Sequence, residues 1–232
     1  MSLGQVTLPN RSEFLAHGYF HWKGFLGEDR VAALRAAAEG LLAGPGALHT
    51  PESVRVLEVY RHGPEFVALL EDSQLWAFVD GLLGANAVLS DLSLNEVRRG
   101  GKTDRWHIDY PYNDMPEVVR GGILGLQCVL PLVPFTVETG ATQLVPGSHE
   151  RYRQPEDVAD SDAVPFVAEP GDLLVLQSAT WHRAGNNLTD EPRTAVLLSF
   201  VESWVKPMGG APESGPWSVT EHARARLGIT RG

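Results

Sequence analysis

Cysteine, lysine and long apolar runs are all scarce in this sequence. The single cysteine, Cys128, lies inside an apolar run, which excludes a disulfide framework and favours a reducing, cytoplasmic location. No apolar stretch approaches the roughly 18 residues of a spanning helix, and no signal peptide is recognisable, so we expect no membrane segment. Only three of the 19 basic residues are lysines and alanine is abundant, which is typical of a GC-rich bacterial genome.

Basic residues are also outnumbered by acidic ones. The chain has 19 Lys and Arg against 29 Asp and Glu, a formal net charge of −10, which argues against nucleic acid or an anionic membrane as a partner. Its 232 residues are 43% hydrophobic and 21% charged, as in a soluble globular protein, and we expect one domain over residues 1–232. The composition gives no indication of an oligomeric state.

The N-terminal part of the chain has mainly helical periodicity. Apolar residues recur at helical spacing between residues 28 and 42, and turn residues separate this segment from its neighbours. We expect helices over residues 11–16, 28–42, 65–70 and 75–83, and strands over 18–23 and 54–61. These helices are expected to form an outer layer away from the site.

From residue 87 onward the apolar residues alternate with a period of two. Between residues 87 and 97, Leu92 and Leu94 share one face while Asp91, Ser93 and Asn95 share the other, so the polar face is expected to border a wet cavity. Further strands are expected over 123–132, 142–145, 172–177 and 193–200. The predicted fold class is mainly β with an N-terminal helical layer: a double-stranded β-helix, that is, a cupin-like jelly roll.

A His-x-Asp sequence and a distant histidine form a candidate metal site. In an extended strand, His107 and Asp109 leave the same face, and His182 follows another apolar strand. Two histidines and one carboxylate suit divalent iron and leave other positions of the ion open. Zinc accepts the same ligands, but a zinc hydrolase has no need of the arginine described next.

Arg193 lies 11 residues after His182 and opens the last predicted strand. Its guanidinium offers a fixed fork of donors that matches a carboxylate, so it is the candidate for binding a diacid co-substrate. Asn95, Gln127 and Thr142 are further candidates for contacting the co-substrate. For these three residues, internal hydrogen bonding is an equally good interpretation.

Five motifs occur in a characteristic order: His107-Ile108-Asp109, residues 140–149 (GATQLVPGSH), Pro170-Gly171-Asp172, Trp181-His182, and Arg193. This ordered set resembles the phytanoyl-CoA dioxygenase family of Fe(II)/2-oxoglutarate oxygenases, over about residues 12–203. The resemblance implies a double-stranded β-helix that binds iron through His107, Asp109 and His182. It assigns the distal carboxylate of 2-oxoglutarate to Arg193.

The resemblance implies an enzyme that uses Fe(II), 2-oxoglutarate and O₂, releases succinate and CO₂, and most simply hydroxylates a small-molecule substrate. Desaturation, epimerisation and ring closure remain alternatives within the family. Halogenation is disfavoured, because Asp109 fills the position that chloride needs. The rival from another class is a non-catalytic, cupin-like metal-binding or sensor module, and Arg193 argues against it.

Three loops near the motifs are expected to form a mobile rim over the metal: residues 100–105, 111–121 and 151–164. Arg98, Arg99, Lys102 and Arg105 place four positive charges just before His107. Either these charges are simply solvated, or they attract an anionic or carrier-bound substrate.

Overall fold

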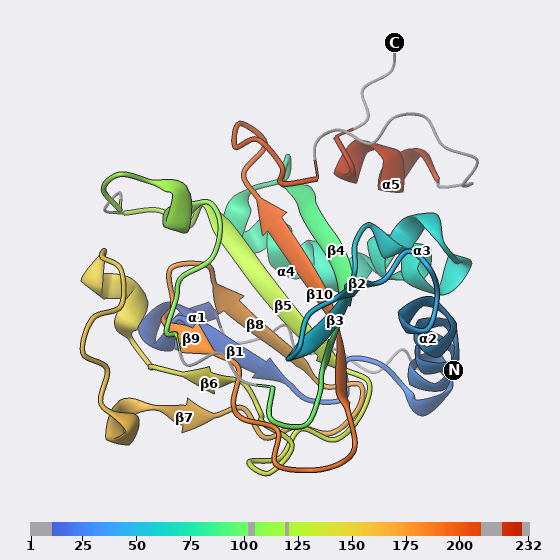
Figure 1. The fold of residues 1–232 in the computed structure, drawn as a ribbon. Helices are drawn as coiled ribbons and strands as arrows, with labels where there is room; N and C mark the ends of the chain where they lie inside the picture. The colour runs from blue at the N-terminus through green and yellow to red at the C-terminus, as the bar shows by residue number, and fades with distance from the viewer. Residues whose placement is uncertain (1–10, 102–104, 119–120, 210–219, 229–232) are drawn as a thin grey trace.

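The computed structural model describes residues 11–101, 105–118, 121–209 and 220–228 (Figure 1). Its α-helices are α1 (Arg11–His17), α2 (Glu28–Leu42), α3 (Pro64–Leu70), α4 (Ser73–Leu83) and α5 (Glu221–Arg226). Its strands are β1 (Tyr19–Trp22), β2 (Leu48–His49), β3 (Ser53–Val56), β4 (Val88–Val97), β5 (Gly125–Pro131), β6 (Gln143–Leu144), β7 (Val164–Pro165), β8 (Leu173–Gln177), β9 (His182–Arg183) and β10 (Arg193–Val201). Short 3₁₀ helices are η1 (Val59–Arg61), η2 (Tyr112–Asp114), η3 (Ser148–Arg151) and η4 (Asp160–Asp162).

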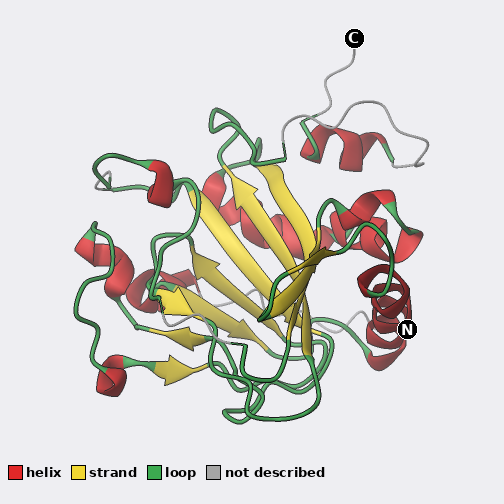
Figure 2. Ribbon diagram, in the orientation of Figure 1, coloured by secondary structure: helices red, strands yellow, loops and turns green. Residues whose placement is uncertain are grey.

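Seven antiparallel strands form the large sheet, in the order β1-β8-β5-β10-β4-β3-β2. The side chains on one face of these strands join a single apolar cluster with those of α2, α3 and α4, including Leu34, Trp76 and Phe200. Figure 1 shows α4 behind this sheet and α2 and α3 beside it, and Figure 2 separates the helices from the strands by colour. The helices therefore cover one face of the sheet and leave the other free to build a site.

The second face of the large sheet turns toward a small sheet of three strands, in the order β7-β6-β9. Leu144 of β6 packs in one apolar cluster with Leu174 and Leu176 of β8 and with Ala195 of β10. In β10, Arg193, Ala195 and Leu197 alternate with Thr194, Val196 and Leu198, so the first set faces this interior. The interior between the two sheets is where the candidate ligands lie.

The predicted fold class, mainly β with an N-terminal helical layer, is confirmed. The predicted helices over 28–42 and 75–83 correspond to α2 and α4, and Asp72 caps α4 by accepting hydrogen bonds from the backbone N–H groups of Gln74 and Leu75. The predicted strand over 54–61 is wrong in its second half, because β3 ends at Val56 and η1 follows. Glu58 adopts a left-handed conformation that ends the extended backbone.

Among the described residues, no helix is both long enough and apolar enough to cross a membrane. The organisation as one domain stays a prediction.

Candidate metal centre

His107, Asp109 and His182 meet at one point between the two sheets. One ligand atom from each of them lies within 4.8 Å of the others. Nε2 of His182 is 3.2 Å from Oδ2 of Asp109, and Nε2 of His107 is 3.8 Å from Oδ1. The structure thus brings together the three residues that the sequence singles out.

The backbone around His107 differs in one respect from the sequence prediction. His107 and Asp109 were expected within a regular strand, but His107 forms only an isolated bridge to His182 of β9. The N–H of each histidine donates to the carbonyl of the other over 3.0 Å. The Asp109 N–H donates to the carbonyl of Ser178 over 2.7 Å. Pairing with the segment 178–182 therefore fixes the His-x-Asp sequence without a longer strand.

Both histidines are oriented through the ring nitrogen that faces away from Asp109. Nδ1 of His107 is 3.2 Å from the carbonyl oxygen of Arg105, and Nδ1 of His182 is 2.9 Å from that of Thr180. A carbonyl only accepts, so a neutral imidazole must carry its proton on Nδ1. The lone pair of each Nε2 is then directed toward the carboxylate, which is the arrangement that metal-binding histidines adopt.

The surroundings of the three side chains also fit a cation. Oδ2 of Asp109 is buried and has no hydrogen-bond partner among the described residues. Burial favours the protonated form of Asp109, but the adjacent His182 and His107 outweigh it and hold the pKa of this carboxyl below its usual range. Burial, reinforced by His182, lowers the pKa of His107. Burial acts against the charged form of His182, but the adjacent Asp109 outweighs it and raises the pKa of this histidine. When both imidazoles are deprotonated at Nε2, the set offers two nitrogens and one carboxylate, the donors that divalent iron accepts.

An inner cavity of about 310 Å³ extends from the three ligands to Arg193. The Arg193 side chain is only 5% exposed, and burial lowers its pKa to about 10. One terminal nitrogen donates to the carbonyl of Gly140, and the guanidinium carbon lies 4.6 Å from the centre of the Phe135 ring. Nε has no hydrogen-bond partner within the described part of the chain. A buried cation with an unused donor fits a carboxylate at this end of the cavity.

The other predicted co-substrate residues line the same inner cavity. Asn95 lies on β4, Gln127 on β5, and Thr142 just before β6. Their roles stay predictions. Arg55 also lines this cavity and was missed by sequence analysis. It is opposite Asn95 in the β3–β4 pairing, so only the register of two separate strands brings it to the site.

An outer cavity of about 430 Å³ shares His107 and Asp109 with the inner one. Its other lining residues are Arg105, Trp106, Ile108, Asn113, Gln154 and Pro155. Arg105, Asn113, and Gln154 with Pro155 come from the three loops that the sequence predicted to form a rim, 100–105, 111–121 and 151–164. The predicted mobility of the rim stays a prediction, and residues 102–104 and 119–120 lie outside the described part of the chain.

The predicted basic cluster is divided between different environments. Nε of Arg98 is 3.8 Å from a carboxylate oxygen of Glu96, and Arg99 pairs with Asp190. Arg105 lines the outer cavity, and Lys102 lies outside the described residues. An anionic substrate therefore stays a prediction that rests mainly on Arg105.

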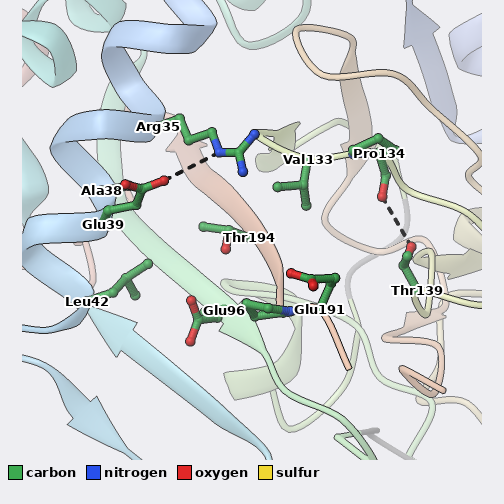
Figure 3. Close-up of a pocket in the computed structure, with 11 residues that line it drawn as sticks. Arg35, Ala38, Glu39, Leu42, Glu96, Val133, Pro134, Thr139, Glu191 and Thr194 are labelled. Carbon is green, nitrogen blue, oxygen red and sulfur yellow. Dashed lines mark hydrogen bonds and ion pairs between the residues drawn. The ribbon is translucent and has the colours of Figure 1, made fainter. Parts of the chain in front are cut away.

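A separate cavity of about 360 Å³ lies on the helical side of the large sheet (Figure 3). It is bounded by Arg35 and Leu42 of α2 and by Glu96 and Thr194 of β4 and β10. Glu96 and Thr194 are paired in the sheet and alternate with the residues that face the metal ligands. The sheet thus separates this cavity from the candidate metal centre.

Sequence comparison identifies both a family and individual relatives. The profile of the family described as phytanoyl-CoA dioxygenase (PhyH) matches residues 14–195. An uncharacterised protein of Mycobacterium tuberculosis is 31% identical over 150 residues, which cover 63% of this chain and 55% of the relative. This chain thus spans about half the length of the curated relatives it matches.

Two solved structures share the fold. The epimerase SnoN, in complex with Fe³⁺, α-ketoglutarate and nogalamycin RO, superposes with a TM-score of 0.70 at 21% identity, over 89% of this chain and 90% of SnoN. The non-heme, α-ketoglutarate-dependent carbocyclase SnoK from nogalamycin biosynthesis gives a TM-score of 0.70 at 22% identity, over 86% of this chain and 85% of SnoK. At such identities the likeness concerns the fold.

Proposed function

The chain belongs to the phytanoyl-CoA dioxygenase family, and on that premise we propose that it is an Fe(II)/2-oxoglutarate-dependent dioxygenase that hydroxylates a small metabolite. The enzymes of this family use Fe(II), 2-oxoglutarate and O₂. The observation that carries the proposal is the convergence of His107, Asp109 and His182 within 4.8 Å, beside a cavity that ends at a buried arginine. A non-catalytic metal-binding module has no need of that arginine.

His107, Asp109 and His182 would hold the iron through two Nε2 atoms and one carboxylate. When bound, iron with 2-oxoglutarate and O₂ supplies the oxidising power for attack on an unactivated C–H bond, with release of succinate and CO₂. Arg193 would hold the distal carboxylate of 2-oxoglutarate and so orient the co-substrate along the inner cavity. Thr142 and Ala195, which line the inner cavity with Arg193, are buried and would exclude water from the bound carboxylate.

Epimerisation and ring closure are the second candidate outcome. SnoN is an epimerase and SnoK a carbocyclase, and both share this fold. These reactions need the same ligands and co-substrate, and they differ in how the substrate is held after the first hydrogen is removed. Desaturation belongs to the same group, whereas halogenation is disfavoured because Asp109 occupies the position for chloride.

Anaerobic titration with Fe(II) and 2-oxoglutarate tests the proposal. We expect a visible charge-transfer band at one equivalent of each, followed on exposure to air by succinate formation that a substrate accelerates. A product heavier by one oxygen atom indicates hydroxylation. A product of unchanged mass indicates epimerisation, and loss of two hydrogens indicates desaturation or ring closure. If the apoprotein binds iron but 2-oxoglutarate produces no band, the chain is a metal-binding module.

A further inference from the structure

The outer cavity has an unusually polar lining beside the metal ligands. Between them, Arg105, Asn113 and Gln154 contribute a guanidinium and two carboxamides, next to His107 and Asp109. The large apolar side chains that are exposed among the described residues, such as Leu48, Leu188 and Trp204, do not line it. This inference rests on the proposed function, because it concerns the substrate that the oxidising centre acts on.

Asn113 is held in place by the backbone of a metal ligand and by a buried tyrosine. Its N–H donates to the carbonyl of Asp109 over 3.2 Å. The neighbouring Tyr112 is 1% exposed; its hydroxyl accepts from the N–H of Leu124 over 2.9 Å and donates to the carbonyl of Gly122 over 3.2 Å. The exposed carboxamide of Asn113 is therefore attached to a fixed support close to the metal centre.

Gln154 is held from the opposite loop by a buried tryptophan. The indole N–H of Trp181 donates to the carbonyl of the preceding residue, Arg153, over 3.0 Å. The guanidinium of Arg151 lies 4.5 Å from the centre of the same indole ring. Because Trp181 is fully buried and directly precedes His182, the position of Gln154 is tied to that of a metal ligand.

Trp106 completes the wall and carries an unused donor. Its Nε1 is buried without a hydrogen-bond partner among the described residues. The guanidinium of Arg183 lies 4.5 Å from the centre of the Trp106 ring, which limits movement of the indole. The cavity therefore offers a flat aromatic group together with the two carboxamides.

We propose that Asn113 and Gln154 are specificity-determining residues that select a hydroxyl-rich small molecule, a polyol or glycoside. A carboxamide both donates and accepts hydrogen bonds. It therefore matches a hydroxyl group, which also donates and accepts. A site built to hydrogen-bond hydroxyl groups rejects an analogue that lacks them, because its own polar groups lose water without gaining a partner. An alkyl or fatty acyl chain meets that penalty in this cavity.

Two neutral polyols, myo-inositol and methyl β-D-glucoside, and one neutral alkyl compound, octanamide, test the proposal. Binding is followed through the visible band of the anaerobic complex with Fe(II) and 2-oxoglutarate, and through saturation-transfer NMR of the probe with the metal-free protein. We expect at least one polyol to perturb the band and to show NMR transfer, and octanamide to do neither. Asn113→Leu and Gln154→Leu should each raise the half-saturating polyol concentration about tenfold, the size of one lost hydrogen bond.

Gln74→Leu is the matched control, because Gln74 is an exposed glutamine at the start of α4, outside both cavities. It should leave polyol binding unchanged. Tighter binding of octanamide, no response to either polyol, or unchanged polyol binding in both variants would overturn the proposal. Loss of the iron and 2-oxoglutarate band in the two leucine variants would also overturn it, because the residues would then be structural. Absence of the band in the unmodified protein contradicts the proposed function instead, and the NMR measurement still tests the substrate class.

Discussion

Two backbone carbonyls decide which nitrogen each histidine presents to the candidate metal site. Arg105 and Thr180 each accept from the Nδ1 of the histidine two residues later, His107 and His182. The i, i+2 spacing is the same in both segments, so each histidine is oriented by its own chain. The Nε2 atoms are therefore directed to the carboxylate before any ion binds, which reduces the ordering that binding requires.

Removal of one ligand should abolish metal-dependent activity. We expect His182→Ala and Asp109→Ala to lose stoichiometric iron, measured by metal analysis after anaerobic loading, together with all succinate formation. The physical reason is that two remaining donors from a set of three bind divalent iron weakly. His62→Ala is the control, because His62 is exposed and lies outside both cavities. Full turnover by His182→Ala would show that another group completes the site.

Arg193 should determine the affinity for 2-oxoglutarate. In Arg193→Leu the distal carboxylate is buried without its charged partner, which typically costs about 3 kcal/mol and corresponds to a KM on the order of 100-fold higher. Iron binding should be retained, since Arg193 is at the far end of the inner cavity. Arg193→Lys keeps the positive charge but loses the paired donors of the guanidinium. Its KM for 2-oxoglutarate should therefore lie between those of the wild type and Arg193→Leu. An unchanged KM in Arg193→Leu would assign the carboxylate to another residue, and Arg55 is the first candidate.

At the scale of elements, Asp172 joins β1 to the turn before β8. Its carboxylate accepts hydrogen bonds from the backbone N–H groups of Gly24 and Glu169 over 2.8 and 3.1 Å, and lies 2.8 Å from Nε2 of His21. Burial favours the protonated acid, but these bonds outweigh it and lower the pKa of Asp172. The pairing of β1 with β8 at the edge of the large sheet thus depends on an ionised carboxylate.

Asp172→Ala should therefore destabilise the protein by about 3 kcal/mol near neutral pH, since it leaves partly buried donors unpaired. A carboxyl group whose pKa is lower in the folded state stabilises that state above its unfolded pKa of about 3.9. The contribution is lost as the pH falls through the folded pKa. The difference in free energy of unfolding between wild type and variant, from denaturant titrations, should thus shrink below about pH 4. Asp162→Ala, at an exposed position in η4, should show no such difference.

Two glycines let the loop before β6 pack against the loop after β9. Gly140 has φ +80°, and a Cβ there would lie 2.6 Å from the carbonyl oxygen of Gly185. The Gly140 carbonyl is also the acceptor for Arg193. Close backbone contact between distant loops therefore positions the arginine of the inner cavity.

Gly140→Ala should raise the KM for 2-oxoglutarate several-fold in addition to lowering stability, because the displaced carbonyl no longer holds Arg193. Gly84→Ala provides the matched control. Gly84 has φ +90°, but a Cβ there meets nothing within 4 Å. Its backbone, with ψ 159°, lies in a region that residues other than glycine rarely adopt, at a cost of about 1–3 kcal/mol. The variant should therefore lower stability and leave the KM unchanged. Equal KM values in the two variants would contradict the role assigned to the Gly140 loop.

At the scale of the whole molecule, Cys128 reports on the integrity of the fold. It is fully buried in the apolar cluster between the large sheet and the helices, and burial raises the pKa of its thiol. We expect Ellman's reagent to leave the native protein unmodified and to react with one thiol per chain in denaturant. If the chain is one domain, as the sequence predicts, thiol exposure and tryptophan fluorescence should change in a single coincident transition.

Mn²⁺ with 2-oxoglutarate should shift the unfolding transition of the protein to higher denaturant concentration, because ligands that bind only the folded state stabilise it by mass action. His182→Ala should lack the shift. Rapid labelling of the native protein would show that the cluster around Cys128 opens locally.

The sequence by itself determined the fold class and singled out the three candidate ligands that the structure brings together. Helical spacing before residue 84 and alternation after residue 87 separate the two layers, because each periodicity records which side chains of one element face the core. The ordered motifs around His107, Asp109, His182 and Arg193 placed the chain in its family. These signals are local or consist of the order of motifs along the chain, and they need no knowledge of which strands pair.

Only the tertiary structure decided what surrounds those ligands. Arg55 reaches the inner cavity because β3 pairs with β4 opposite Asn95, and the strand predicted over 54–61 ends early at a left-handed residue. Asn113 and Gln154 face one cavity because Tyr112 and Trp181 anchor two unrelated loops. Such contacts join segments that lie far apart in sequence, so no local pattern encodes them, and they exist only once the apolar clusters have packed.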